Sequence, residues 1–344
     1  MQLNAQTKVI KMSATKSADY GVTYFLPKTV FTIEVNYSKT TQKAGPFAKY
    51  AEKYLGVNEK SVVLEDQVYY TLDKISMGSH GIPDKNESYL VEFKAKTTSP
   101  FVSLTEDGLI CSINADYVPE PATQAKPAVS PSEQLPAIDA QSNYTEEYLL
   151  AGSVIKMAEV AAKQIYKIRE SRNDILTGEA ENTPRDGEGM KIVLSKLEAQ
   201  EKALVELFTG TTLTETLGSE FELEPLSDID KDVLFRFSKY AGVVDADDLS
   251  GSPVYINVKN IEPSEPEIVD PKRKAKEPLS IVYNVPGKAS VEIFYGINSL
   301  YRNTFLVAQF GKKQILATSL FDDKKAPVKV YFYPQTGAIK QIIQ

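Results

Sequence analysis

The sequence predicts an α+β protein in which two β-rich domains flank an antiparallel helical hairpin. Three observations lead to this fold class. Apolar residues alternate with a period of two towards both ends of the chain, they recur at helical spacing in the middle, and proline-containing segments separate these regions. At 344 residues the chain is longer than one small core usually requires. We therefore expect an N-terminal domain over 7–116, a linker over 117–144, the hairpin over 145–212 and a C-terminal domain over 213–344.

The expected N-terminal domain combines strands with one short helix. Apolar and polar residues alternate from Phe31 to Ser38, which is typical of a strand with one face on a core and the other in water. A helix is predicted from Gly45-Pro46-Phe47 to Gly56, because proline favours the first helical position and glycine the position after the last. Further strands are predicted at 62–64, 68–72 and 89–93, with turns at 84–86 and 106–108.

The segment 117–144 is predicted to be an extended linker. Five prolines lie between Pro119 and Pro136, among Ala, Ser, Thr and Gln. Because proline fixes φ and removes a hydrogen-bond donor, this stretch favours solvated, extended backbone. A spacer is the interpretation we prefer, and a ligand for a proline-binding module is the alternative.

From Thr145 onwards the apolar spacing becomes helical. Thr145 is the expected N-cap of a helix that ends before Thr177-Gly178, and a second helix ends at Thr209-Gly210. Glu201 interrupts the apolar seam of the second helix. We expect the two helices to fold back as an antiparallel pair that packs on the β domains, or alternatively forms a homo-oligomer contact with a second subunit. The seam residues are Val154, Ala158, Ala161, Ile165 and Ile168 in the first helix and Met190, Leu194, Leu197, Leu204 and Phe208 in the second.

The expected C-terminal domain is again β-rich. Residues 328–333 alternate, 334–337 form a turn, and 338–343 form the returning strand. The proline-containing insert 262–278, acidic and then basic, is expected to be an exposed loop.

Two segments far apart in the chain show a weak internal echo. Tyr24-Phe25-Leu26-Pro27 begins a strand reaching Glu34, and Tyr283-Asn284-Val285-Pro286 begins one reaching Glu292. The spacing from Pro to Glu differs by one residue. Duplication of a β unit is one interpretation, and a coincidence between two edge strands is the one we prefer.

The first six residues resemble the end of a secretory signal peptide that is cut after Ala5. We therefore expect an exported protein, either secreted or located in the periplasm or cell envelope. No apolar run reaches the ~20 residues of a membrane-spanning helix, so no transmembrane segment is expected.

Composition limits the partners and the redox chemistry. The net charge of −7 disfavours nucleic acid, because a phosphate backbone is bound chiefly by clustered lysine and arginine. The basic run at 272–276 is best explained as a solvated loop. Cys111, the single cysteine, allows no internal disulfide, and its apolar neighbours predict a buried thiol.

Catalytic, cofactor-binding and metal-ligating residues are not predicted, and no cofactor is expected. His80 could act as a base at neutral pH, but its glycine-rich surroundings predict an exposed turn. Histidine-based zinc or iron sites need more His and Cys ligands than the chain has. Asp228, Asp230 and Asp232 have the first spacings of a calcium loop, but Val233 and Lys239 occupy its glycine and glutamate positions. A second acidic group at 245–248 is also off pattern.

With these segments in place, the chain resembles an uncharacterised family of Bacteroidetes proteins, domain of unknown function 4831. The resemblance spans most of the chain and implies an exported bacterial protein. It brings no activity and no catalytic residues. The segments that carry it are Tyr20–Thr29, Gly45–Ala51, Arg169–Glu179, Phe208–Gly210 and Ala308–Gly311.

Taken together, these observations favour a cell-envelope binding or assembly protein without catalytic activity. The alternative is a glycan-acting hydrolase that uses paired carboxylates, which the 46 acidic residues allow. The absence of tryptophan weighs against the glycan interpretation, because indole is the best aromatic platform for stacking.

Overall fold

The computed structural model describes residues 8–11, 21–92, 102–117, 145–181, 184, 187–263, 280–317, 320 and 328–344. The expected signal remnant, nearly all of the linker, the basic run and most of the insert 262–278 lie outside the described residues.

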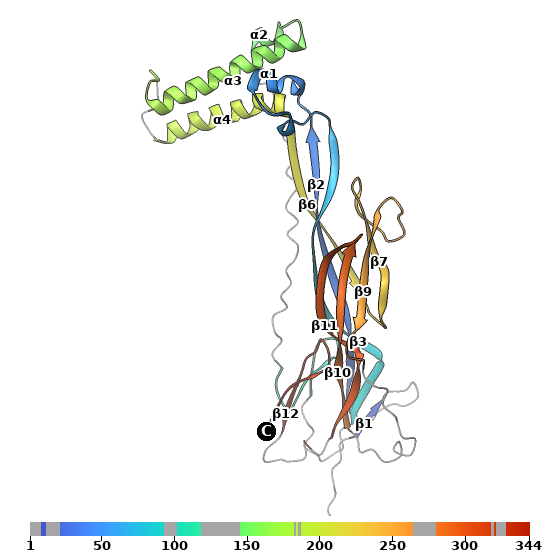
Figure 1. Cartoon of the computed structure of the whole chain (residues 1–344). Coiled ribbons are helices and arrows are strands. Elements are labelled where there is room, and N and C mark those ends of the chain that lie inside the picture. Colours follow the sequence, from blue (N-terminus) through green and yellow to red (C-terminus); the bar gives the residue numbers. More distant parts are fainter. Residues whose placement is uncertain are drawn as a thin grey trace, which may run out of the picture.

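The chain folds as an elongated α+β protein with antiparallel sheets and a helical part at one end (Figure 1). The described strands form three sheets. The first has the order β1 (Lys8–Lys11), β3 (Gln67–Glu92), β2 (Gly21–Lys43) and β6 (Thr211–Leu223). The second has the order β11 (Asn298–Ala317), β10 (Ser280–Tyr295), β9 (Ser252–Asn260), β7 (Ile229–Ser238) and β8 (Gly242–Val244). The third has the order β13 (Ile339–Ile343), β12 (Lys329–Phe332), β5 (Ile110–Ile113) and β4 (Val102–Leu104).

The strands of the first sheet are much longer than the sequence pattern predicted. The run at 68–72 and the described part of the run at 89–93, residues 89–92, belong to the single strand β3, and the turn expected at 84–86 lies inside it. His80 also lies in β3 and not in a loop. The strand expected at 62–64 is absent, because these residues connect a short 3-10 helix, η2 (Glu59–Ser61), to β3. At ~3.3 Å per residue, β2 extends about 75 Å.

Two cores lie between the sheets, and the expected N-terminal and C-terminal domains both contribute to each. The first core joins Phe31, Ile33 and Val35 of β2 to side chains of β7, β9, β10 and β11. The other core joins Tyr24 and Leu26 to side chains of β5, β10 and β12. Residues 7–116 and 213–344 therefore pack into the same interiors.

The hairpins β2–β3 and β10–β11 share an unusual break in pairing. In the first, the pairing jumps from Phe25–Ser88 to Pro27–Pro83, and in the second from Val285–Lys312 to Gly287–Val307. In both hairpins, the pairing thus advances by two residues on the first strand and by five residues on the second. The breaks fall within or beside the Tyr-to-Pro echo of the sequence.

The short hairpins that follow are also alike. The backbone N–H of Phe25 donates to the carbonyl of Gly108 at the β4–β5 turn, and that of Asn284 donates to Gly337 at the β12–β13 turn. Both glycines have positive φ. The shared geometry identifies β2–β5 and β10–β13 as structural repeats. We had preferred to explain the echo as a coincidence between two edge strands, and this was wrong, because neither strand is at an edge. β2 lies between β3 and β6, and β10 lies between β9 and β11.

Polar side chains join the two repeats where their pairing breaks; we call Thr29, Asn284 and Gln309 the polar junction. The Gln309 amide accepts a hydrogen bond from the Thr29 N–H and donates one to the Thr29 carbonyl, both at 2.8 Å. The Asn284 amide donates to the carbonyls of Pro27 and Thr336 at 3.1 Å. These bonds satisfy the backbone of Thr29, which precedes the start of the β2–β6 pairing at Phe31, and the carbonyls of Pro27 and Thr336.

The helices lie at the far end of the first sheet (Figure 1). A 3-10 helix, η1 (Ala48–Tyr50), and α1 (Ala51–Leu55) occupy most of the predicted 45–56 helix, and Gly56 ends α1 with φ 66°. Thr145 caps α2 (Glu146–Leu149), but α2 is separate, because a new helix, α3 (Val154–Thr177), begins at the cap Ser153. The next helix, α4 (Gly187–Thr209), packs along α3. Among the helices of the described residues, none is both long and apolar enough to cross a membrane.

We call α2, α3 and α4 the arm, and its base is firmly attached to the first sheet. Phe47 packs against Phe208 and Tyr148, with ring centroids 5.3 and 6.1 Å apart, and its N–H donates to the Leu207 carbonyl. A Cβ on Gly45 would lie 2.2 Å from that same carbonyl oxygen, so only glycine allows this approach. The arm therefore leaves the sheet through a packed base and not through a flexible joint.

We predict that Gln309→Leu destabilises the fold by about 2–4 kcal/mol, because it leaves the buried N–H and carbonyl of Thr29 without partners. Chemical denaturation followed by circular dichroism measures this loss. The matched control is Gln341→Leu on the exposed strand β13, which should stay within about 0.5 kcal/mol of the wild type. Equal midpoints for the two variants would contradict the role given to the polar junction.

Candidate functional site

His80 lies with a hydroxyl and a carboxylate on three neighbouring strands. Its Nδ1 is 3.1 Å from the Thr32 Oγ1 of β2, and its Nε2 is 4.0 Å from the Glu222 Oε1 of β6. The three residue types are those of a hydrolase triad, which is recognised by geometry and not by sequence order. Such an arrangement would support a catalytic interpretation only if its surroundings excluded water.

Those surroundings are open to solvent. The side chains of His80 and Glu222 are 43% and 67% exposed, and both lie on the polar outer face of the first sheet. A hydroxyl nucleophile needs a water-excluded site with donors aimed at the developing oxyanion. A flat sheet surface does not supply one, so we interpret this group as a cross-strand polar contact.

Two carboxylates line a hollow of about 430 Å³ between the two repeats. Asp84 and Glu87 lie in it together with Asn284, Gln309 and Lys313. Glu87 accepts a hydrogen bond from the Tyr89 hydroxyl at 2.6 Å and pairs with Lys313 at 2.7 Å. Glu87 is thus already engaged by an ammonium group and a hydroxyl, whereas glycoside hydrolysis needs a carboxyl that can give its proton to the leaving group. The geometry thus gives the hydrolase alternative no general acid at this position.

The aspartate clusters act in local backbone structure. Asp228 Oδ1 accepts from the Asn260 N–H at 2.8 Å, and Asp248 Oδ1 accepts from the Ser250 N–H at 2.9 Å. The second bond also lowers the pKa of Asp248. Within the part of the chain that the structure describes, no three His, Cys, Asp or Glu side chains gather closely enough to hold a metal ion.

Cys111 is buried in β5 among apolar side chains. Burial raises the pKa of its thiol to about 11, and a hydrogen bond with the backbone of Thr105 opposes this only in part. Since the thiolate is the reactive form, Cys111 is a core residue and not a nucleophile.

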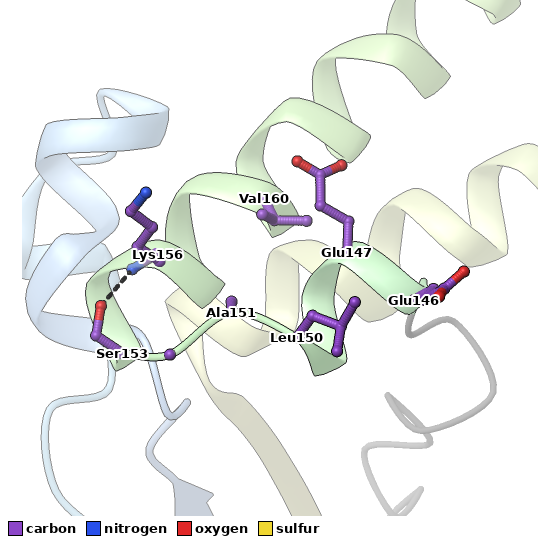
Figure 2. Close-up of a pocket in the computed structure, with 8 residues that line it drawn as sticks. Glu146, Glu147, Leu150, Ala151, Ser153, Lys156 and Val160 are labelled. Atoms are coloured by element: carbon purple, nitrogen blue, oxygen red, sulfur yellow. Dashed lines mark hydrogen bonds between the residues drawn. The ribbon is translucent and has the colours of Figure 1, made fainter.

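The feature that the sequence pattern did not locate is a hollow at the elbow between α2 and α3 (Figure 2). It has a volume of about 660 Å³, and Leu150 and Ser153 come from the connection itself. The Ser153 hydroxyl caps α3 by accepting from the Lys156 N–H, so it is already engaged. Glu146, Glu147, Leu150, Ala151, Gly152, Ser153, Lys156 and Val160 line the hollow.

Apolar side chains around this elbow face the solvent. Leu149 at the end of α2, Leu150 of the connection, and Val154 and Ile155 of α3 are all exposed, with Leu150 at 76%. Such a group, next to polar residues, is typical of a surface that contacts another molecule. The break between α2 and α3 after Leu149 creates this apolar surface. The sequence pattern predicted one continuous helix from Thr145 and therefore did not predict the surface.

Farther from the sheet the arm loses its core. The buried residues of α3 lie between Ala158 and Ile168, and those of α4 begin only at Leu204. Glu201, which interrupts the predicted seam, pairs with Arg169 at 2.6 Å and Arg172 at 2.8 Å. Beyond these ion pairs, Leu176 is 68% exposed. The arm is therefore the candidate functional site, with contact chemistry and no reactive group.

Comparison with known proteins identifies a family for this chain but no activity. A family model described as "Domain of unknown function (DUF4831)" matches residues 20–340. No curated protein and no solved structure matches the chain.

We predict that Cys111 of the native protein reacts with a thiol reagent at pH 8 more than about 100-fold more slowly than the same residue in the unfolded chain, whose pKa is ~8.5. Spectrophotometric titration with and without denaturant measures the two rates. Rapid labelling of the native protein would show that β5 opens to solvent.

Proposed function

This chain belongs to the DUF4831 family, and from its geometry we propose that it is a non-enzymatic binding or assembly protein of the cell envelope. In this proposal the arm is an antiparallel helical hairpin, set between two β-rich halves of the chain, and it is the part that contacts a partner.

The observation that carries the proposal is the arm itself. It extends from the end of the first sheet away from the second and third sheets, so its outer part touches little else of the described chain (Figure 1). A helical pair that served only the stability of the β cores would be expected to lie on them. Here the apolar side chains of the elbow and of the outer arm face solvent instead.

The attachment of the arm supports the same conclusion. The Tyr166 hydroxyl of α3 donates to the Tyr54 carbonyl of α1 at 2.8 Å, and the Val63 N–H donates to the Thr209 carbonyl at the end of α4. These bonds, together with the aromatic contacts of Phe47, fix the direction of the arm. A rigid projection loses little conformational freedom when a partner binds, which favours affinity.

The envelope location is part of the proposal and follows from the export signal expected in the first six residues. Fractionation of cells that produce the native gene product tests it, and recovery in the cytoplasm would contradict it. The arm proposal does not depend on that outcome.

We predict that a photo-crosslinking amino acid placed at Leu150 or Leu176 forms specific adducts in intact cells, because both side chains are exposed on the arm. Gel shift and mass spectrometry detect the adducts. The controls are Ile297 at the β10–β11 turn and Leu226, which are equally apolar and exposed but lie on the β body. Adducts from the body positions at the same yield would contradict a contact role for the arm.

A further inference from the structure

The outer part of the arm has apolar side chains but no interior. We define the distal arm as Arg169–Thr177 of α3 and Gly187–Ala203 of α4; no side chain described in it is fully buried. It nevertheless contains Ile175, Leu176, Met190, Val193, Leu194 and Leu197. Two helices lying side by side cover only one flank of each seam residue, so a dry core requires a further layer of structure.

At the base of the arm that further layer is present. Phe47 and Ala51 from the η1–α1 segment and Tyr148 from α2 pack over the seam, where Ala161 and Ile165 reach 0% exposure. The same seam continues into the distal arm without a cover among the described residues. The distal arm is thus an incomplete helical bundle.

The charges along the arm suggest what completes it. The described residues of 173–190, where α3 ends and α4 begins, carry four acidic residues and no basic residue, a net charge of −4. Residues 165–172 and 191–203, the adjoining shaft, carry six basic and three acidic residues, a net charge of +3. An antiparallel contact between two arms lays each acidic tip over the other's basic shaft, whereas a parallel contact would bring two acidic tips together.

We propose that the distal arm forms an antiparallel four-helix bundle with the distal arm of a second copy of this chain. This inference rests on the proposed contact role of the arm and names its partner. Each seam then gains the missing layer, and the two-fold symmetry makes the contact self-complementary.

The size of the contact fixes how strong the dimer can be. Two helices, each ~10 Å wide, overlapping along ~20 Å, bury about 400 Å² per copy. That is about half of the ~800 Å² per partner of a standard interface, so we expect a reversible dimer with a micromolar or weaker dissociation constant. Because charge complementarity contributes, the dimer should weaken as salt is added.

Sedimentation velocity of the full chain, from about 5 to about 500 μM, tests the proposal over the micromolar range of dissociation constants. We expect the wild type to shift from monomer to dimer. Leu176→Ser, which removes a 68% exposed side chain from the seam side, should raise the dissociation constant at least about tenfold.

The matched control lies on the same arm. Ile192 is 59% exposed but is five positions from Leu197, about 140° around α4 from the seam. Ile192→Ser should leave the dissociation constant unchanged. Since both replaced side chains are exposed, neither variant should unfold the arm, and circular dichroism checks this.

Single cysteines report the orientation. Arg172→Cys, four positions after the seam residue Ile168 and near the middle of the overlap, should form a disulfide-linked dimer under mild oxidation, while Thr177→Cys at the tip should not, because each tip lies over the partner's shaft. The native Cys111 is buried and does not interfere.

Three results would overturn the proposal: a wild type that stays monomeric throughout, a dimer weakened by Ile192→Ser and not by Leu176→Ser, or tip-to-tip disulfides. A monomer whose arm still forms specific crosslinks in cells would remove the second copy as the partner and leave the contact role standing. A monomer without such crosslinks would remove both.

Discussion

Strand β2 has to fill two cores, and the irregular pairing beside Pro27 is the constraint on which the rest of the fold depends. It supplies Tyr24 and Leu26 to one core and Phe31, Ile33 and Val35 to the other. β10 likewise contributes to both cores, through Ile281 and through Ala289, Val291 and Ile293. The break falls between Phe25 and Pro27, and β10 has an equivalent break between Val285 and Gly287. The polar junction of Thr29, Asn284 and Gln309 satisfies the backbone of Thr29 and the carbonyl of Pro27 beside the first break.

The length of the first sheet follows from this arrangement, and so does the position of the arm. Beyond the first core, β2, β3 and β6 continue as a narrow ribbon whose end is covered by η1, α1 and the base of the arm (Figure 1). The close approach of Gly45 to Leu207 and the positive φ of Gly210 let the helices leave the ribbon abruptly. The fold thus separates a β body, which consists of two repeats, from a helical element held at a distance from it.

The described residues that looked reactive have surroundings that do not suit catalysis. Thr32, His80 and Glu222 lie on an open sheet face, Glu87 is paired with Lys313, and Cys111 is buried in the third sheet. Catalysis depends on groups that are both desolvated and free to exchange protons, and none of these positions offers both. On the arm, exposed apolar side chains lie close together at the elbow, at Leu149, Leu150, Val154 and Ile155. The elbow is therefore the observation behind the contact role that we propose for the arm.

The sequence by itself determined those features that depend only on interactions between neighbouring residues. The ends of the helices at Gly56, Gly178 and Gly210, the cap Thr145, the alternation in residues 31–38 and the turn at 334–337 were all predictable, because each depends on the φ and hydrogen-bond preferences of a few neighbours. The apolar seam of the arm was also predictable, but not that its outer half has no cover, since burial depends on what other segments pack there. Only the tertiary structure decided that 68–72 and 89–92 are one strand, that His80 lies within it, and that Tyr24–Pro27 and Tyr283–Pro286 mark equivalent breaks in two interior strands. These features arise from pairings between residues more than two hundred positions apart or from register over a whole strand, and neither leaves a periodicity in the local sequence.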